Sequence, residues 1–381
     1  MPFSLYVHIP YCLSKCPYCD FNAYAVQSWP EARYIDALCK EFACYMQAPP
    51  WQGETLETIY FGGGTPSLFQ PASLEHFLTC VADHCPLAPD LEVSLEADPA
   101  TVSLDTLSGY RALGMSRLSL GIQSFEPSVL RTLGRIHTRE EALQTIELAR
   151  AAKFFNLNID LIFGVPNQTL DLLTRDLNQA FGCEPEHISM YGLAYEENTP
   201  FYAMRQKGIL QPVDEETEVA MYSQVQAACA AHGYERYEIS NFARPGYASQ
   251  HNLHYWQGGA YLGLGAGAHS FSCTRGWGTR WSNIRSPKAY MELALSTGRA
   301  DQYVEHLTQE QARGEFLFLN LRQMDGMSLS GFARRFGQPF FEQFPHAADM
   351  VSKGLMTQSA GKVRLTPKGL LVADSVFASF F

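Results

Sequence analysis

Three cysteines stand close together near the start of the chain, in the stretch YCLSKCPYCDFN (residues 11–22). Cys12, Cys16 and Cys19 are spaced four and then three residues apart, so one loop can present all three thiols. The N-terminal sequence has no pattern of a secretory signal, and disulfides are rare in reducing compartments. This group of three cysteines therefore indicates metal or redox chemistry. The other seven cysteines stand singly or in helical patterns, and we expect them to be small buried hydrophobic residues.

Three thiolates are an incomplete ligand set, and three kinds of site remain open. A structural zinc ion usually takes four nitrogen or sulfur ligands, and His8 is the only nearby donor. A redox pair of Cys16 and Cys19 would not need the third cysteine. A [4Fe–4S] cluster prefers four thiolates, so with three of them one iron keeps an open position for a small molecule. The spacing favours the cluster.

The elements that must position this loop alternate between strands and helices. Apolar or β-branched runs predict strands at 5–9, 58–63, 91–98, 117–123, 155–164 and 187–193. Helical patterns fall between them, for example at 30–46, 72–83, 139–153 and 215–232. Such a series predicts a parallel sheet, either doubly wound or curled into a barrel.

The unusual residues decide between these two architectures. Glycines, acids and the cysteines follow the C-terminal ends of all six predicted strands. In a barrel the site collects at that end from many strands, whereas in an open sheet it concentrates at one switch point. We therefore expect an α/β fold with a barrel-like sheet.

Two further motifs lie at strand ends. FGGGTPS (61–67) has three glycines, which would let the backbone approach a ligand and present amide N–H groups to a carboxylate. A plain tight turn is the alternative. SLEADP (94–99) supplies Glu96, an acceptor suited to ribose hydroxyls or an amine.

A C-x3-C-x2-C loop after the first strand of a six-unit α/β chain resembles the radical S-adenosylmethionine (SAM) superfamily. The resemblance implies a partial (β/α)6 TIM-like barrel that binds a [4Fe–4S] cluster on Cys12, Cys16 and Cys19. It also implies that the amino and carboxylate groups of SAM chelate the open iron. An electron from the cluster then cleaves the sulfonium to a 5′-deoxyadenosyl radical.

The chain is most similar to the branch that contains oxygen-independent coproporphyrinogen III oxidases and HemW-type heme chaperones. YVHIPYCLSKCPYCDF, GGGTPS, EADP, LGIQSF, LGRIHT and NIDLIFG occur in that order between residues 6 and 164. The resemblance carries the SAM contacts of the family onto Tyr6, Gly63, Gly64, Thr65, Glu96, Gln123, Arg135, Asp160 and Ala194. For Arg135, a solvated surface position in a loop is the alternative.

Two features divide the carriers of this branch from the oxidases. The oxidases place a further cysteine two residues after the third, where this chain has Phe21. HNLHYW (251–256) matches the HNxxYW motif of the chaperone group. A neutral imidazole can ligate heme iron, so His251, chosen over His254 by its motif position, is the candidate ligand. Tyr255 and Trp256 could stack on the macrocycle; a loop with packed aromatics and hydrogen-bonded histidines is the alternative.

The resemblance thus implies a heme chaperone that binds heme, a [4Fe–4S] cluster and SAM and passes heme to acceptor proteins. It would need an electron donor if SAM is cleaved, and no catalytic residue is assigned. Two alternatives remain: an oxygen-independent coproporphyrinogen III oxidase, which Phe21 disfavours, and another radical SAM enzyme, for instance one acting on tRNA.

Composition sets the remaining expectations. A net charge of −11 and a pI near 5.5 argue against nucleic acid as a partner. The longest apolar runs, of about ten residues, are too short to span a bilayer, so we expect a cytoplasmic protein without a transmembrane segment. We expect a barrel core at 1–235, a Tyr/Gly/His-rich extension at 236–299, and a small C-terminal winged-helix-like domain at 300–381.

Overall fold

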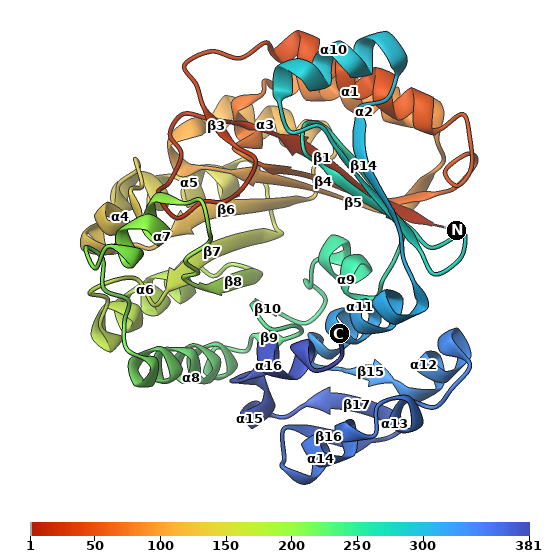
Figure 1. The fold of residues 1–381 in the computed structure, drawn as a ribbon. Helices are drawn as coiled ribbons and strands as arrows, with labels where there is room; N and C mark the ends of the chain where they lie inside the picture. Colours follow the sequence, from red (N-terminus) through yellow and green to blue (C-terminus); the bar gives the residue numbers. More distant parts are fainter. Residues whose placement is uncertain (1) are drawn as a thin grey trace.

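A single curved sheet forms the centre of the molecule (Figure 1). The structure is a computed structural model that describes residues 2–381. Six parallel strands lie side by side in chain order: β1 (Phe3–Ile9), β4 (Leu56–Gly63), β5 (Leu87–Ala97), β6 (Arg117–Gln123), β7 (Leu157–Phe163) and β8 (His187–Gly192). Because neighbours in sequence are neighbours in the sheet, all their C-terminal ends meet at one edge. The six expected strands and the partial barrel are confirmed.

Helices cover the convex side of this sheet (Figure 1). The main ones are α1 (Glu31–Tyr45), α2 (Pro71–His84), α3 (Leu104–Ala112), α5 (Arg139–Ala151), α6 (Leu170–Gly182) and α8 (Glu215–Ala231). Side-chain caps fix several starts; for example, Thr138 and Glu141 form a capping box at α5. The four helices that we expected are present, while α3, α6 and the short α4 (Pro127–Leu133) and α7 (Pro200–Gln206) were not predicted. None of the helices described in residues 2–381 is both long and apolar enough to cross a membrane.

The sheet continues beyond the six parallel strands on both sides. Next to β1 lie β11 (Tyr261–Leu264), β12 (His269–Ser272), β13 (Thr279–Asn283) and β14 (Asp301–His306), while β10 (Asn241–Ala243) and β9 (Glu235–Arg236) follow β8. The first contact is parallel and joins Ser4 to Tyr261. Most of the Tyr/Gly/His-rich extension that we expect at 236–299, for which no strands were predicted, therefore adds strands to this sheet. Helix α10 (Pro287–Thr297) follows β13 and lies against α1.

The HNLHYW segment forms a short helix, α9 (Gln250–Trp256), on the concave side of the sheet (Figure 1). The Glu92 carboxylate, near the start of the buried part of β5, accepts the N–H groups of Gln250 and His251 at 3.2 and 3.1 Å. Thr58 on β4 contacts the His251 ring. Helix α9 thus lies at the end of the barrel opposite the cysteines.

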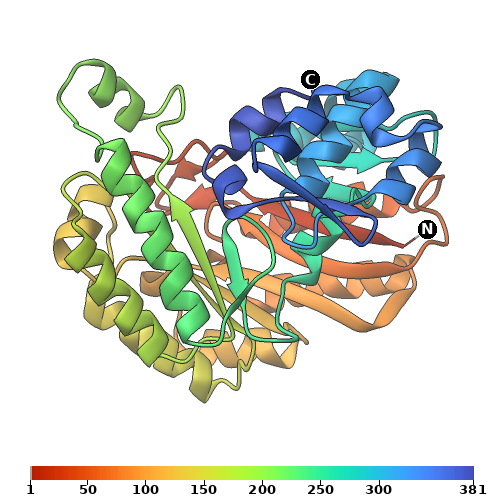
Figure 2. The same ribbon diagram turned by 90° about the horizontal axis from the view of Figure 1, so that it is seen from below.

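The C-terminal residues form a separate unit with its own hydrophobic core. Its elements are α11 (Gln309–Leu321), β15 (Met327–Ser328), α12 (Leu329–Phe336), α13 (Phe340–Gln343), α14 (His346–Ser352), β16 (Met356–Ser359), β17 (Lys362–Leu365), α15 (Pro367–Leu370) and α16 (Ala373–Ala378). The antiparallel order β15-β17-β16 and the succession helix, strand, helices and hairpin are those of a winged helix, as expected. Seen from below, this unit (blue) lies across the open side of the sheet (Figure 2). The division of the chain at residues 235 and 299 stays a prediction.

Candidate functional site

A cavity of about 410 Å³ opens at the C-terminal ends of the parallel strands. The cysteine loop forms one wall, and the ends of β4 to β8 form the others. The predicted residues that line it are Cys12, Cys16, Cys19, Gly63, Gly64, Thr65, Glu96, Gln123, Arg135, Asp160 and Ala194. Residues from segments that are far apart in the sequence are therefore gathered at one place, as the barrel prediction required.

The cysteine loop is fixed at both ends and in the middle. Short strands β2 (Tyr11–Cys12) and β3 (Tyr24–Ala25) pair in parallel at its base. The backbone N–H of Phe201, at the start of α7, donates to the Pro17 carbonyl at 3.0 Å. Gly134, at the end of α4, packs so closely on the Pro17 ring that a Cβ there would lie 2.8 Å from it. These contacts hold the loop in a defined shape.

The thiols suit a group that binds sulfur ligands. Burial raises the pKa of Cys12 to about 11 and also raises the pKa of Cys19, so both need a cationic centre to become thiolates. Arg135 Nη1 donates a hydrogen bond to Cys16 Sγ at 3.3 Å. Three thiols presented by one loop, one of them already hydrogen-bonded to a cation, are a donor set that suits an iron–sulfur cluster.

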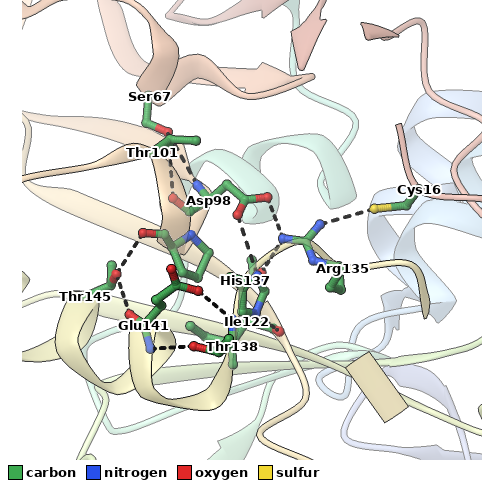
Figure 3. Close-up of polar contacts among 12 residues, drawn as sticks. Cys16, Ser67, Asp98, Thr101, Ile122, Arg135, His137, Thr138, Glu141 and Thr145 are labelled. Carbon is green, nitrogen blue, oxygen red and sulfur yellow. Dashed lines mark hydrogen bonds and ion pairs between the residues drawn. The ribbon is translucent and has the colours of Figure 1, made fainter. Parts of the chain in front are cut away.

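Arg135 is held in place by a buried polar network (Figure 3). Its Nη2 donates to Asp98 Oδ2 at 2.5 Å and to the Gly121 carbonyl at 2.8 Å. His137 Nδ1 lies 3.6 Å from Asp98 Oδ1, while its Nε2 donates to the Ile122 carbonyl at 3.0 Å. Although burial opposes ionisation, His137 and Arg135 hold the pKa of Asp98 below its usual value.

Arg135 is therefore a buried part of the cavity wall and not a solvated surface residue. Asp98 and His137 belong to the same site but were not among the predicted site residues. The motifs EADP and LGRIHT contain both of them, so the signal was present in the sequence.

The glycine turn plays a different part from the one expected. The N–H groups of Gly63, Gly64 and Thr65 donate to Glu96 Oε2, the Ile9 carbonyl and the Tyr11 carbonyl, at 3.2, 2.7 and 2.8 Å. The expectation of free amides for a ligand carboxylate is therefore wrong, since all three already have protein acceptors. The turn instead joins β4 to the base of the cysteine loop.

Steric contacts explain why this turn consists of glycines. Gly63 has φ +112°, and a Cβ there would lie 2.5 Å from the His8 ring. A Cβ on Gly64 would lie 2.6 Å from the Tyr11 carbonyl oxygen, which belongs to the backbone and cannot move aside. The glycines thus permit the close approach of the turn to the cysteine loop.

Two half-buried carboxyl groups, Glu96 and Asp160, line the cavity below the cysteines. Burial raises the pKa of Glu96 to about 7, and nearby Asp160 adds to the shift, while a hydrogen bond from the Tyr60 hydroxyl at 2.8 Å opposes it. Burial also raises the pKa of Asp160, which accepts bonds from Ser119 and Asn158 at 3.0 and 2.8 Å. Both groups can become fully ionised when a cationic or hydroxyl-bearing ligand contacts them.

Gln123 is aimed into the cavity by an irregular backbone. The pairing of β6 with β7 shifts between Leu120 and Gln123, and Gln123 has φ +66°. A residue other than glycine with this φ is uncommon and is found preferentially at functional sites.

The cavity is acidic overall. Asp20, Glu96, Asp98, Asp160 and Glu196 line it, against the two cations Lys15 and Arg135. A ligand with positive charge, such as a sulfonium or an ammonium group, suits this balance better than an anion does.

Tyr6 and His8 lie next to the cavity but are not among the residues that line it. His8 Nε2 donates to the Asn22 carbonyl at 3.0 Å, and its Nδ1 accepts from the Tyr6 hydroxyl at 3.0 Å. Both ring nitrogens are therefore engaged, and the fourth ligand that a zinc site would need is not supplied by His8. Tyr6 supports this ring from the barrel interior.

The HNxxYW residues lie at the other end of the barrel. The His251 ring is only 1% exposed and stacks on Tyr60 with ring centroids 5.0 Å apart. Its Nδ1 is 2.7 Å from Thr58 Oγ1, which itself donates to Ser4, so Nδ1 carries the proton. Burial lowers the pKa of His251 to about 3, and its Nε2 has no hydrogen-bond partner in the described residues.

The other HNxxYW residues face away from the cysteine cavity. His254 Nε2 is 2.8 Å from the Ala260 carbonyl, and Tyr255 and Trp256 line a second cavity beside α11. Heme contact by these four residues stays a prediction. Because the His251 ring is buried, a heme iron could reach its Nε2 only if the neighbouring side chains moved.

Comparisons with known proteins agree with this geometry. Family models match the radical SAM superfamily over residues 6–179 and the HemN C-terminal domain over residues 307–372. The chain is 38% identical to heme chaperone HemW of Bacillus subtilis (strain 168), covering 99% of this chain and 98% of that protein. It is 31% identical to heme chaperone HemW of Lactococcus lactis subsp. lactis (strain IL1403), covering 100% and 97%. Among solved structures it resembles coproporphyrinogen III oxidase (HemN) from Escherichia coli, a radical SAM enzyme, with TM-score 0.84 and 26% identity over 100% of this chain and 90% of that one.

Proposed function

Because the chain belongs to the HemW family of heme chaperones, we propose that it binds heme, a [4Fe–4S] cluster and SAM and transfers heme to acceptor proteins. The observation that carries this proposal is similarity to named heme chaperones along the entire chain, from the cysteine loop to the C-terminal unit. The enclosed cysteine loop and the acidic cavity beneath it support the two cofactors.

Cys12, Cys16 and Cys19 would hold the cluster at the mouth of the cavity. When bound, the cluster supplies an open iron position and an electron for cleavage of SAM. The Arg135 guanidinium donates a hydrogen bond to one of the thiolates and so stabilises its negative charge. Asp98 and His137 fix the orientation of Arg135.

SAM would lie between the cysteines and the strand ends. Glu96 would accept hydrogen bonds from its amine or ribose hydroxyls, and Gln123, Asp160 and Ala194 would line the remainder. The Gly63–Thr65 turn contributes its shape and not its N–H groups, since these are already donated. Tyr6 does not line the cavity, so we propose that it supports the site indirectly, through its hydrogen bond to His8.

A coproporphyrinogen III oxidase is the second candidate, favoured by the structural similarity to HemN. The position of the extra cysteine of the oxidases is occupied here by Phe21, whose side chain is 59% exposed at the rim of the cavity. The phenyl ring of Phe21 has no thiol and cannot act as a hydrogen donor or metal ligand. The chaperone is therefore the better supported function.

Several finer statements rest on the family and on composition. We propose that heme-accepting apoproteins are the partners, that an electron donor is needed only if SAM is cleaved, and that the protein works in the cytoplasm. The acidic net charge supports the absence of a nucleic-acid partner.

Anaerobic reconstitution tests the proposal. The protein should take up one oxygen-sensitive cluster, and Cys16→Ala should remove most of its iron and sulfide, while Cys183→Ala, a cysteine outside the cavity, should not. The same sample should bind about one heme per chain and should release no CO₂ from coproporphyrinogen III with SAM and a reductant. Robust CO₂ release would replace the chaperone with the oxidase, and unchanged iron in Cys16→Ala would remove the cluster assignment.

A further inference from the structure

A second cavity lies between the barrel and the C-terminal unit. It has a volume of about 270 Å³ and shares no lining residue with the cysteine cavity. We call it the α9–α11 cavity, because the end of α9 and the inner side of α11 form two of its walls; strands β11 to β13 and α12 complete it. Its lining residues are Tyr255, Trp256, Gly258, Gly259, Tyr261, Phe271, Arg280, Leu307, Ala312, Glu315, Phe316, Phe318, Leu319 and Arg335.

Flat aromatic rings dominate these walls. Tyr255 and Tyr261 have ring centroids 4.5 Å apart, and Tyr261 and Phe271 are 6.4 Å apart. The end of α9 is fixed to the C-terminal unit, since Gln323 donates to the Trp256 carbonyl at 3.0 Å and the Arg322 guanidinium lies 4.5 Å from the centroid of the Trp256 ring. These contacts fix the positions of the rings, and the cavity suits a planar apolar ligand.

The charges at this cavity have the opposite balance from those at the cysteines. Arg280 is neutralised by Glu305 and Glu315, at 2.6 and 2.8 Å. Arg335 has no carboxylate within ion-pair distance in residues 2–381, and its guanidinium lies 5.6 Å from the ring centroids of Phe316 and Phe336. Glu315 attracts Arg335 electrostatically but forms no salt bridge with it in the described residues. A guanidinium beside apolar rings and outside a salt bridge can recognise a carboxylate on a flat apolar ligand.

These features favour a tetrapyrrole here over the cysteine cavity. Heme combines a planar apolar macrocycle with two propionate groups, and the excess of acidic side chains in the cysteine cavity disfavours those propionates there. The α9–α11 cavity offers rings to the macrocycle and Arg335 to a propionate. Building on the proposed function, we propose that heme binds in the α9–α11 cavity, with its macrocycle against Tyr255, Tyr261 and Phe316 and one propionate at Arg335.

The size of the cavity fits a cargo that must leave again. Sites that enclose drug-sized ligands usually measure about 300–1,000 Å³. A cavity of about 270 Å³ therefore takes one edge of a macrocycle and leaves the rest accessible to an acceptor. His251 lies directly behind Tyr255, with ring centroids 4.6 Å apart, so recognition of the macrocycle does not depend on ligation of iron by that histidine.

Anaerobic titrations with heme and with metal-free protoporphyrin IX test this site. Leu319→Trp fills the cavity from a half-buried position and should abolish binding of both. Arg335→Glu should weaken binding at least tenfold, whereas Arg334→Glu, an exposed neighbour on α12 that does not line the cavity, should leave it unchanged. Saturation with SAM should not compete. Circular dichroism of each variant shows whether it is folded. If Leu319→Trp does not fold, the comparison of Arg335→Glu with Arg334→Glu still tests the site.

The outcomes separate this inference from the function on which it rests. If the unaltered protein binds no heme, the chaperone proposal itself fails. If it binds heme but Leu319→Trp and Arg335→Glu bind equally well, only the location is overturned. Competition by SAM would likewise move heme to the cysteine cavity. Loss of heme but not of protoporphyrin in His251→Ala would add an iron ligand while keeping the location.

Discussion

The contacts of Arg135 indicate a second role for this side chain. By resemblance it is a SAM contact, but its Nη1 donates directly to Cys16 Sγ while Asp98 and Gly121 hold the other nitrogen. A hydrogen bond to a thiolate ligand stabilises the more negative, reduced state of a cluster. A cluster held by these cysteines would therefore be tuned by Arg135, besides any contact of this arginine with SAM.

Replacement of Arg135 should alter the reduction potential more than the cluster content. In Arg135→Gln the iron and sulfide should remain, because the three thiols are intact. The midpoint potential should become more negative by some tens of mV and by up to about 60 mV, because a hydrogen bond to a charged group is worth about 1.5–3 kcal/mol and only the part that differs between the two oxidation states shifts the potential. Anaerobic redox titration followed by electron paramagnetic resonance measures this shift. Arg131→Gln, an exposed arginine on α4, is the matched control, and an equal potential in both variants would contradict the argument.

Glu96 should make SAM binding depend on pH. Its pKa is about 7 in the protein without ligand, and a bound amine or hydroxyl favours the ionised form. Binding should therefore release a proton, and affinity should rise with pH, by up to tenfold per unit, until about pH 7. Glu96→Gln should lose that dependence and leave only the titration of SAM itself. Isothermal titration between pH 5.5 and 8 measures both proteins.

The same shift has a consequence for the stability of the empty protein. A carboxyl group whose folded-state pKa is raised contributes stability below its ordinary pKa of 4.5, and that stability is lost as pH rises to about 7. Glu96→Gln should remove this loss. Urea unfolding of the ligand-free chain at pH 5 and pH 8 therefore checks the pKa independently of SAM, and an equal loss in both proteins would place the titration elsewhere.

At the scale of elements, the start of helix α9 is capped by the Glu92 carboxylate in addition to the Ser249 hydroxyl. Glu92 accepts hydrogen bonds from the N–H groups of Gln250 and His251 and lies 3.4 Å from the Ser249 hydroxyl. A negative group at a helix N-terminus satisfies free donors and interacts favourably with the helix dipole. Helix α9 has only seven residues and would be marginal alone.

Glu92→Ala should therefore lower the free energy of unfolding by about 1–3 kcal/mol, because it leaves buried N–H groups without acceptors. It should also speed hydrogen exchange in residues 250–256. Glu57→Ala removes an exposed carboxylate near the same helix. This carboxylate lies 3.8 Å from His254 Nδ1, and its loss should cost far less. Urea unfolding compares the two variants. Similar losses would mean that α9 is held by its aromatic contacts alone.

The elements also show what the sequence could and could not predict. The six parallel strands were recognisable because each is a largely apolar or β-branched run, and local patterns carry that information. Strands β11 to β14 were missed because they have only four to six residues and carry no clear alternation. Their place in the sheet also depends on a pairing between distant segments, such as that of Ser4 with Tyr261. The engaged amides of Gly63–Thr65 could not be foreseen for the same reason, because their acceptors Ile9 and Tyr11 belong to another strand.

At the scale of the molecule, the C-terminal unit and the barrel are joined by polar contacts as well as by apolar packing. The sheet and its helices share one large core, and the C-terminal unit has another. Arg322, the residue that follows α11, forms an ion pair with Glu238 of the barrel, with Nε and Oε2 3.2 Å apart. Its guanidinium also lies over the Trp256 ring. Glu238 is fully buried and also accepts from Ser240 and Asn241 at 2.9 and 2.6 Å. Arg322 therefore connects the C-terminal unit to the barrel and to a wall of the α9–α11 cavity.

Arg322→Ala should consequently act on the joint between the two cores. It leaves the buried Glu238 carboxylate without its cation, and breaking a buried pair from one side costs about 3–5 kcal/mol; the partly exposed guanidinium places this case at or below the lower end. If the penalty comes from the uncompensated charge, adding Glu238→Gln to Arg322→Ala should recover part of it, although each single change destabilises. Because each core can then unfold separately, tryptophan fluorescence and circular dichroism should give different midpoints in urea for Arg322→Ala and one shared midpoint for the unaltered chain. Additive losses in the double variant, with coincident transitions throughout, would show that the C-terminal unit is attached by its apolar contacts and that the ion pair contributes little.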